Sequence, residues 1–272
     1  MCCLLAVCET VRDNLSTVDH NPPAPAVEFR GVSKRFPDGT LAVDQLDLAL
    51  GRGTITCLVG SSGCGKTTVL RMINRMIDPT SGQVLVGGID AAGVEPVALR
   101  RSIGYVMQHA GLLPHRTVID NIATVPVLRG VKRADARERA LALMHDVGLD
   151  PKLARRYPAQ LSGGQQQRVG VARALAADSD LLLMDEPFGA VDPVVRADLQ
   201  RELQRLQRDL GKTVVFVTHD IDEAFLLGDR VALFKPGGVL AQFGSPEQLL
   251  HEPADAFVAE FIDAGRPRSI LR

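Results

Sequence analysis

The sequence predicts an α/β protein in which a parallel β-sheet with crossover helices is joined by an antiparallel part and interrupted by a helical part. A run that is apolar apart from Thr56, Ile55 to Val59, leads into a glycine-rich loop and then into helical spacing from Thr67 to Ile77. Strand-like runs return at Leu181 to Met184 and at Val214 to Thr218, each followed by a helical segment. This alternation is typical of parallel strands with crossover helices.

The first folded segments follow a different pattern. Apolar and polar residues alternate in Val27 to Phe36 and in Leu41 to Leu50, on either side of a Pro37-Asp38-Gly39 turn. This pattern predicts antiparallel strands with one face in water. The segment before them, HNPPAPA, is rich in proline and is typical of a linker, so we expect residues 1–26 to be a disordered tail. Its apolar start, MCCLLAVC, lacks the basic region of a signal peptide.

The remaining segments complete the expected domain. Residues 95–175 are rich in Arg and Ala and contain helical stretches such as Arg133 to Val147, so we expect an inserted helical subdomain there. A Pro236-Gly237-Gly238 turn between two short apolar runs predicts a closing hairpin over Arg230 to Gln242. We therefore expect one nucleotide-binding domain over residues 27–245, followed by a helical extension over 246–272.

Composition excludes several classes of function. Lys and Arg number 31 against 32 for Asp and Glu, which leaves no excess of positive charge to hold nucleic acid or an anionic lipid surface. The sequence contains no run of about 18 apolar residues, so we expect no membrane-spanning helix. The five cysteines do not form a disulfide framework, which favours a reducing, cytosolic compartment.

The loop after the first buried strand matches the phosphate-binding pattern G-x-x-x-x-G-K-[ST] in the expected strand–loop–helix context. Its glycines allow the backbone N–H groups to face phosphates at the positive end of the next helix. We expect Lys66 to bridge the β- and γ-phosphates, Thr67 to ligate Mg²⁺ and Thr68 to lie on the α-phosphate side. An ordinary glycine-rich turn would not explain this context. The predicted nucleotide-binding residues here are Gly60, Ser61, Ser62, Gly63, Cys64, Gly65, Lys66, Thr67 and Thr68.

A second buried run, Leu181 to Met184, ends in the adjacent acids Asp185 and Glu186. Because adjacent residues on a strand face opposite ways, the two carboxylates are expected to serve different ligands. We expect Asp185 to orient Mg²⁺ and Glu186 to polarise water as a general base. Alone, such a pair is more simply a polar strand end, and the phosphate-binding loop is what favours the functional interpretation.

The segment Leu161-Ser162-Gly163-Gly164-Gln165, which precedes a helix expected over Gln165 to Ala177, resembles the signature of the ABC family of ATPases. The resemblance implies a P-loop NTPase fold with a RecA-like parallel-sheet core, an antiparallel β subdomain and an inserted helical subdomain. It also implies that this helix start binds the γ-phosphate of ATP held by another subunit. The working unit would then be a head-to-tail dimer with a second copy or a close homologue.

Other family positions follow from the same resemblance. Gln108 resembles the Q-loop glutamine, which touches Mg²⁺ or water, and His219 resembles the switch histidine at the γ-phosphate. Asp192 resembles the D-loop acid at the dimer seam. Phe36 is the candidate for the ring that stacks on adenine, with a packed core aromatic as the alternative. The implied cofactors are ATP and Mg²⁺. The implied catalytic residues are Glu186, His219, Gln108 and Lys66, and the implied metal ligands are Thr67, Gln108 and Asp185, partly through water.

The resemblance implies an ATP-hydrolysing subunit at the cytoplasmic face of the membrane. Its partners would be transmembrane permease subunits and, indirectly, a solute-binding protein. Four stretches are similar to importer ATPases for glycine betaine, carnitine and choline: Arg71–Arg75, Pro79–Gly82, Leu99–Val106 and Leu161–Ala176. Importers of amino acids, methionine or phosphate remain alternatives.

Two other classes are less favoured by the sequence. A non-transport ABC ATPase is expected to carry a coiled-coil insertion or a second nucleotide domain, and neither pattern is present. An idle regulatory subunit is disfavoured because Glu186 and His219 are both present.

Overall fold

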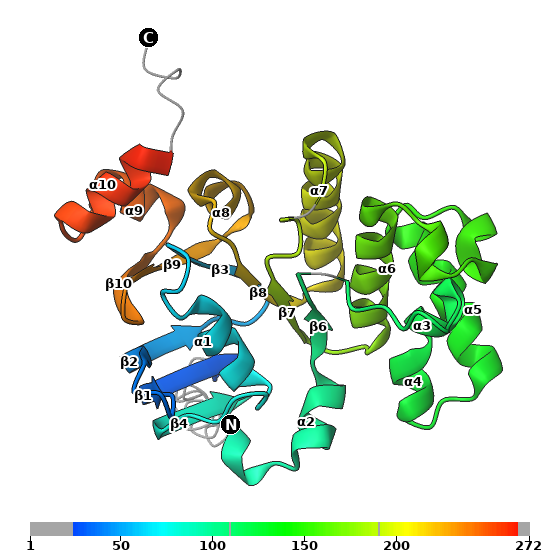
Figure 1. The fold of residues 1–272 in the computed structure, drawn as a ribbon, viewed down its shortest axis with the longest axis horizontal. Helices are drawn as coiled ribbons and strands as arrows, with labels where there is room; N and C mark the ends of the chain where they lie inside the picture. The colour runs from blue at the N-terminus through cyan, green and yellow to red at the C-terminus, as the bar shows by residue number, and fades with distance from the viewer. Residues whose placement is uncertain (1–23, 109, 190, 266–272) are drawn as a thin grey trace, which may run out of the picture.

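The fold was analysed in a computed structural model that describes residues 24–108, 110–189 and 191–265. Of the predicted N-terminal tail, residues 1–23 lie outside the described residues, as do the last seven residues of the predicted C-terminal extension. Figure 1 shows two sheets on one side of the molecule and a group of helices on the other.

The larger sheet has six strands in the order β10-β9-β3-β8-β7-β6. Five of them are mutually parallel, and β10 is antiparallel to β9. Every position of β3, β7 and β8 is buried, which explains why these runs are almost entirely apolar. Because the strands are parallel, the carboxyl ends of β3, β6, β7 and β8 meet at one edge. The strands are β3 (Ile55–Gly60), β6 (Gly104–Val106), β7 (Leu181–Asp185), β8 (Thr213–Val217), β9 (Arg230–Lys235) and β10 (Val239–Gly244).

The smaller sheet is antiparallel, with the order β2-β1-β4-β5. The predicted pair is confirmed as β1 and β2, and two further strands join it that the sequence did not reveal. Helix α1 lies between the two sheets, and its buried side chains share one core with both. The loop 61–65 joins β3 to the start of α1 at Lys66. The elements are β1 (Val27–Arg35), β2 (Leu41–Leu50), β4 (Ser81–Val86), β5 (Ile89–Asp90) and α1 (Lys66–Ile73).

Residues 95–175 contain one strand of the large sheet besides their helices. Within that range, β6 pairs in parallel with β7, Tyr105 opposite Leu183, because its apolar positions are buried in the large sheet. The helices that pack on one another begin at Val118 and form the group on the right of Figure 1. The helices of the range are α2 (Pro96–Ser102), α3 (Val118–Ile122), α4 (Thr124–Leu128), α5 (Arg133–Asp146) and α6 (Gly163–Ala176), with short 3₁₀ turns at Pro151–Arg155 and Pro158–Gln160. A further 3₁₀ turn follows β5 at Ala91–Gly93.

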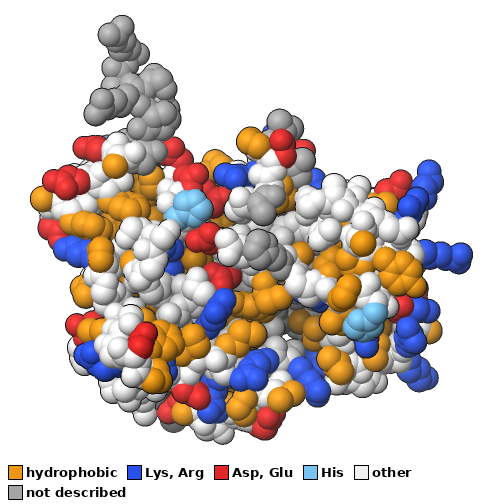
Figure 2. Space-filling model, in the orientation of Figure 1, with side chains coloured by type: hydrophobic (Ala, Val, Ile, Leu, Met, Phe, Trp, Pro, Cys, Tyr) orange, Lys and Arg blue, Asp and Glu red, His pale blue; other side chains and the backbone are white. Residues whose placement is uncertain are grey.

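The last helices are α7 (Pro193–Leu210), α8 (Ile221–Leu227), α9 (Pro246–His251) and α10 (Ala256–Gly265). The described part of segment 246–272 is thus a pair of helices, and α10 packs on α8 and α9. Among the described residues, no helix is long and apolar enough to cross a membrane. Figure 2 shows acidic and basic side chains interspersed on the visible face, with Lys and Arg gathered along the rim of the helical part.

Candidate nucleotide-binding and catalytic site

The phosphate-binding loop lies between β3 and α1, and its glycines adopt backbone conformations that side chains rarely allow. Gly60, Gly63 and Gly65 have φ angles of 152°, 79° and 98°. At Gly65 a Cβ atom would also overlap the carbonyl oxygen of Ala42 on β2. Ser61, Ser62 and Gly63 are exposed. The loop therefore depends on its glycines for its backbone path and presents its central residues to solvent.

The Lys66 side chain lies inside this loop and is only 5% exposed. Its Nζ donates hydrogen bonds to the carbonyl oxygens of Gly60 at 2.7 Å and Ser61 at 2.9 Å, and it lies 3.7 Å from the Cys64 sulfur. The half-buried Thr67 and Thr68 follow in the first turn of α1. The Lys66 ammonium and the hydroxyls of Thr67 and Thr68 thus lie at the start of α1, where an anion is favoured.

Asp185 contacts Thr67 across the sheet edge, where the Thr67 hydroxyl donates a 2.8 Å hydrogen bond to Asp185 Oδ1. Asp185 Oδ2 lies 3.4 Å from both Arg71 Nη2 and the Tyr105 hydroxyl. Burial, and then the negative charge of Asp185, raises the pKa of the Tyr105 phenol. A hydroxyl and a carboxylate held this close form a donor set that Mg²⁺ accepts when phosphate oxygens and water complete its shell.

Arg71 and Tyr105 were not predicted from the sequence as contacts of Asp185. The signal for Arg71 is its position four residues after Thr67, which places both residues on one face of α1. Tyr105 is brought in by the parallel register between β6 and β7. Neither residue belongs to a sequence motif that assigns it a role.

Glu186 points to a different set of partners. His219 Nδ1 lies 3.3 Å from Glu186 Oε2, and Gln108 Nε2 donates to the same oxygen at 3.4 Å. The residues follow β7, β8 and β6, so three strand ends converge on one carboxylate. Glu186 also has a φ of 44°, a left-handed conformation that is uncommon for a residue with a side chain and often marks a functional site.

The segment expected to bind a phosphate of another subunit starts α6. The Ser162 hydroxyl accepts from the Gln165 N–H at 3.3 Å, while Gln165 Oε1 accepts from the Ser162 N–H at 3.0 Å. Ser162 and Gly163 are exposed, and Gly164 and Gln165 are half-buried. In Figure 1, β6 and β7 separate α6 from α1, so the structure does not bring residues 162–165 to the phosphate-binding loop of the same chain.

The two remaining predicted residues lie on loops. Phe36 is half-buried in the turn after β1, and the Lys34 ammonium lies 5.4 Å from the centre of its ring. Asp192 is exposed just before α7, and its carbonyl oxygen accepts the Arg196 N–H at 2.8 Å.

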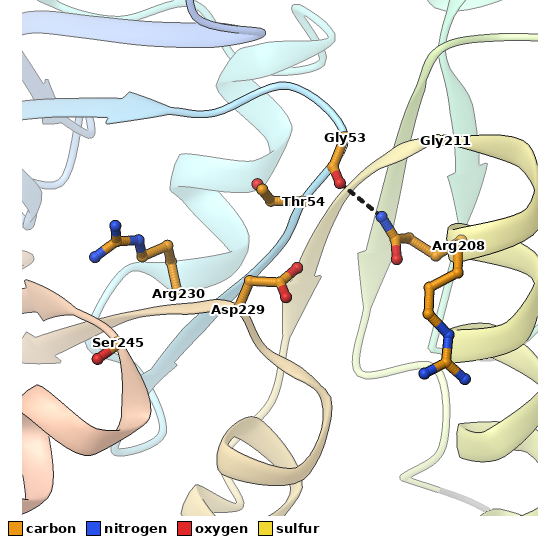
Figure 3. A pocket seen from close by; sticks show the side chains of 8 residues that line it. Gly53, Thr54, Arg208, Gly211, Asp229, Arg230 and Ser245 are labelled. Atoms are coloured by element: carbon orange, nitrogen blue, oxygen red, sulfur yellow. Dashed lines mark hydrogen bonds between the residues drawn. The ribbon is translucent and has the colours of Figure 1, made fainter.

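A wide hollow of about 630 Å³ lies at the opposite edge of the sheet, by the amino ends of β3, β8 and β9 (Figure 3). The amide of Gln207 donates to the Gly53 carbonyl at 2.8 Å across one side of it. Arg208 and Arg230 point away from each other there. This hollow lacks the converging polar groups of a binding site, whereas the carboxyl edge of the sheet has them.

A glycine-rich loop at a helix start, a threonine–aspartate pair and a second carboxylate held by glutamine and histidine define an ATP-binding domain of the P-loop class. Residues 43–189 match the family model described as ABC transporter. Together with the relatives below, this match shows that the chain belongs to the ABC transporter family, whose ATP-binding domain is an ATPase.

The most similar relatives include two proteins named OpuCA. The carnitine transport ATP-binding protein OpuCA of Listeria monocytogenes is 49% identical over 240 residues, which cover 88% of this chain and 60% of that protein. The glycine betaine/carnitine/choline transport ATP-binding protein OpuCA of Bacillus subtilis is 50% identical over 240 residues, covering 88% of this chain and 63% of that protein. The chain thus spans about 60% of the length of these relatives.

A shorter relative and two solved structures extend the comparison. The glycine betaine uptake system ATP-binding protein YehX of Escherichia coli is 50% identical over 235 residues, with 86% of this chain and 76% of that protein covered. The ATP-binding cassette MJ0796, solved as a post-hydrolysis dimer bound to ADP and Pi, has a TM-score of 0.74 at 33% identity over 81% of this chain and 98% of that chain. Clostridium perfringens cbiO1 has a TM-score of 0.77 at 27% identity over 85% of this chain and 92% of that chain. The predicted P-loop NTPase fold of ABC type is confirmed.

Proposed function

We propose that this chain binds and hydrolyses ATP to power an importer of osmoprotectants such as glycine betaine, carnitine or choline. The ATPase mechanism is supported by one observation: the two adjacent acids, Asp185 and Glu186, contact different residues. Asp185 contacts Thr67 at the start of α1, whereas Glu186 contacts His219 and Gln108. One carboxylate is placed for a metal ion and the other for water.

In this proposal, the loop from Gly60 to Thr68 binds the phosphates, and Lys66 leaves its own carbonyl partners to bridge the β- and γ-phosphates. Thr67, Asp185 and Gln108 would hold Mg²⁺, partly through water, and the ion would supply neutralising charge to the phosphate oxygens. Phe36 stacks on the adenine ring. The Phe36 ring is half-buried and lies beside the Lys34 ammonium, so it is at the protein surface and not in the hydrophobic core.

Glu186 then acts as the general base toward the attacking water, because a carboxylate that accepts from the Gln108 amide and lies 3.3 Å from the His219 imidazole is oriented before the nucleotide arrives. His219 contacts the γ-phosphate, and Gln108 contacts the metal ion or water. These roles assign catalytic function to Glu186, His219, Gln108 and Lys66.

The dimer follows from residues that cannot serve their own nucleotide. Ser162, Gly163, Gly164 and Gln165 start a capped helix whose end is accessible from outside. Asp192 is exposed on the loop before α7. We propose that both elements face a second copy or a close homologue in a head-to-tail pair, as expected from the dimeric MJ0796 structure. Two ATP molecules would hold this dimer closed until hydrolysis removes the γ-phosphate contacts.

The proposed permease contact lies on the helical part. Apolar side chains are exposed there at Val127, Leu128, Leu141 and Tyr157, and Met107 is exposed next to Gln108. Figure 2 shows apolar side chains gathered on this side of the molecule. Such a surface suits docking of a protein partner. We therefore place the chain at the cytoplasmic face of the membrane, bound to transmembrane permease subunits and served indirectly by a solute-binding protein.

The domain boundaries belong to the same proposal. Residues 27–245 form the nucleotide-binding domain, with the helical subdomain starting at α3 rather than at residue 95, and residues from 246 form the extension. The osmoprotectant assignment is supported by the printed functions of relatives that are about 50% identical.

Uptake of labelled solutes in the native cells tests the whole proposal. We would compare Lys66→Ala with the wild type for uptake of glycine betaine, choline, amino acids including methionine, and phosphate, at high and low osmolarity. Lys132→Ala is the matched control, because Lys132 is exposed at the start of α5. Loss of betaine or choline uptake in Lys66→Ala alone supports the proposal. Loss of amino acid, methionine or phosphate uptake instead would replace the osmoprotectant assignment with that substrate class.

A further inference from the structure

A small polar cavity lies behind Glu186, at the carboxyl ends of β7 and β8. It has a volume of about 50 Å³. It lies between the starts of α7 and α8, and it is lined by Glu186, Phe188, Gly189, Arg196, Thr218, His219, Asp220 and Glu223. A polar cavity of this size is large enough to hold ordered water, which needs roughly 10 to 15 Å³ per molecule.

Arg196 gives this cavity a buried donor. Its Nε–H is buried and has no hydrogen-bond partner among the described residues. Burying the N–H of a charged group without a partner is costly, so such donors normally bind protein oxygen or ordered water. Since Arg196 lines a cavity that has room for water, a water molecule is the partner that fits.

The other end of the guanidinium reaches toward the loop before α7. Arg196 Nη2 lies 3.5 Å from the carbonyl oxygen of Val191, next to Asp192. Arg196 therefore lies between the loop proposed to face the second subunit and the cavity behind Glu186.

The carboxylates that line the cavity have different roles. Asp220 caps α8 by accepting from the Asp222 N–H at 2.9 Å, and Glu223 accepts from the Gln200 amide at 2.8 Å. Both already have local partners. Glu186 is the carboxylate with partners on the side of the proposed reaction, His219 and Gln108. Arg196 and Glu186 both line the cavity, so water bound there can join the guanidinium to the carboxylate.

We propose that Arg196 is a positioning residue for ATP hydrolysis, which acts through water bound in this cavity to hold the Glu186 carboxylate and its His219 partner in place. This inference rests on the proposed ATPase function. Arg196 does not touch the phosphate-binding loop in any contact that the described residues show, so its loss is expected to affect the chemical step and to leave nucleotide binding in place.

Steady-state ATP hydrolysis by the purified full chain with Mg²⁺ tests the proposal. We expect Arg196→Gln to lower kcat about tenfold, as for one lost charge-assisted hydrogen bond, with KM for ATP changed less than about twofold. Arg196→Lys keeps the charge and is expected to recover part of the loss. Arg201→Gln is the matched control on α7, since the Arg201 side chain is 76% exposed and pairs with Asp198.

A double-mutant cycle with Glu186→Gln separates positioning from a merely structural effect. If Arg196 acts through Glu186, adding Arg196→Gln to the Glu186→Gln variant is expected to change the residual single-turnover rate by less than about twofold. Equal fractional losses in both backgrounds, or a rise in KM that matches the loss of kcat/KM, would overturn the proposal. A wild-type kcat in Arg196→Gln would overturn it as well, whereas a wild-type chain without ATPase activity would refute the proposed function itself.

Discussion

Thr67 and Asp185, separated by 118 positions, share a 2.8 Å hydrogen bond between the threonine hydroxyl and Oδ1 of the carboxylate. The contact exists because α1 packs beneath β7 and β8 while β3 delivers the chain into α1 at the same sheet edge. A metal site can form there only if both the loop after β3 and the end of β7 are in place. The geometry of the proposed metal site therefore depends on the fold of the large sheet.

The Asp185→Asn variant tests the metal assignment. An amide has the size of the carboxylate but lacks its charge, so we expect Mg²⁺-dependent ATP hydrolysis to fall about 10²-fold or more, which is the loss of several kcal/mol of charge stabilisation. Hydrolysis measured against Mg²⁺ concentration checks this. Asp180→Asn is the control, because the Asp180 side chain is 94% exposed just before the same strand. Similar rates in the two variants would remove Asp185 from the metal site.

The Glu186→Gln variant separates binding from hydrolysis. Glutamine keeps the shape but loses the basic oxygen, so we expect hydrolysis to fall by roughly 10² to 10⁴ while ATP remains bound. The variant is then expected to accumulate as an ATP-bound dimer, which size-exclusion chromatography with Mg²⁺ and ATP would detect. Glu138→Gln, at an exposed position of α5, is the control. Hydrolysis by Glu186→Gln at the wild-type rate would show that another group is the base.

The buried strands of the large sheet were predictable because their sequences are apolar at nearly every position, as in β3 and β8. The strands of Ser81–Val86 and Ile89–Asp90 were not, since β4 starts with three exposed residues and gains its strand character by pairing with the distant strand β1, for example Ser81 with Ser33. Residues 95–175 were expected to be helical because Arg and Ala dominate them. Within them, the run from Ile103 to Met107 is nevertheless strand-like in the sequence, and it contains β6.

The site shows the same division. Lys66, Asp185 and Glu186 belong to motifs whose residue spacing predicts a role for each of them. The structure places all three at one edge of the sheet. Tyr105 and Arg196 have no such spacing. Their positions depend on the register of β6 with β7 and on the direction in which α7 leaves its loop, which are set by tertiary packing.

Gly238 is predicted to be required where its neighbour Gly237 is not. Both have positive φ angles, 73° and 85°. A Cβ at Gly238 would overlap the Ala42 carbonyl oxygen and approach Val43 Cα within 2.4 Å, while a Cβ at Gly237 would meet nothing within 4 Å.

We expect Gly237→Ala to lower the free energy of unfolding by about 1 kcal/mol, for the backbone conformation alone, and Gly238→Ala by about 3 kcal/mol, because the backbone must also shift. Urea unfolding measures both. The same Ala42 oxygen lies against Gly65 of the phosphate-binding loop, so Gly238→Ala is also expected to weaken ATP binding. Equal losses of stability in the two variants would show that β2 can move away from the turn.

Asp120 is predicted to make the stability of the helical part depend on pH. Arg137 donates to both of its carboxylate oxygens at 2.9 Å, and Arg133 and the Thr117 hydroxyl add bonds at 3.2 and 3.0 Å. These contacts, led by Arg137, lower the pKa of Asp120 to about 2 from a model-compound value of 3.8. Because the folded pKa lies below the unfolded one, the stabilisation is fully present above about pH 4 and is lost as the pH falls through about 2. Both arginines are substantially exposed, so we expect it to be worth about 1 to 2 kcal/mol.

Urea unfolding of wild type and Asp120→Asn from pH 6 to pH 3 checks this, because the asparagine variant lacks the titrating group. The difference in the free energy of unfolding between the two proteins should be largest at pH 6 and shrink as the pH falls below 4. Asp146→Asn removes a half-exposed carboxylate from the end of α5 and is the control for a general change in net charge. A difference that stays constant down to pH 3 would mean that Asp120 stabilises the link between α3 and α5 through the shape of its hydrogen bonds and not through its charge.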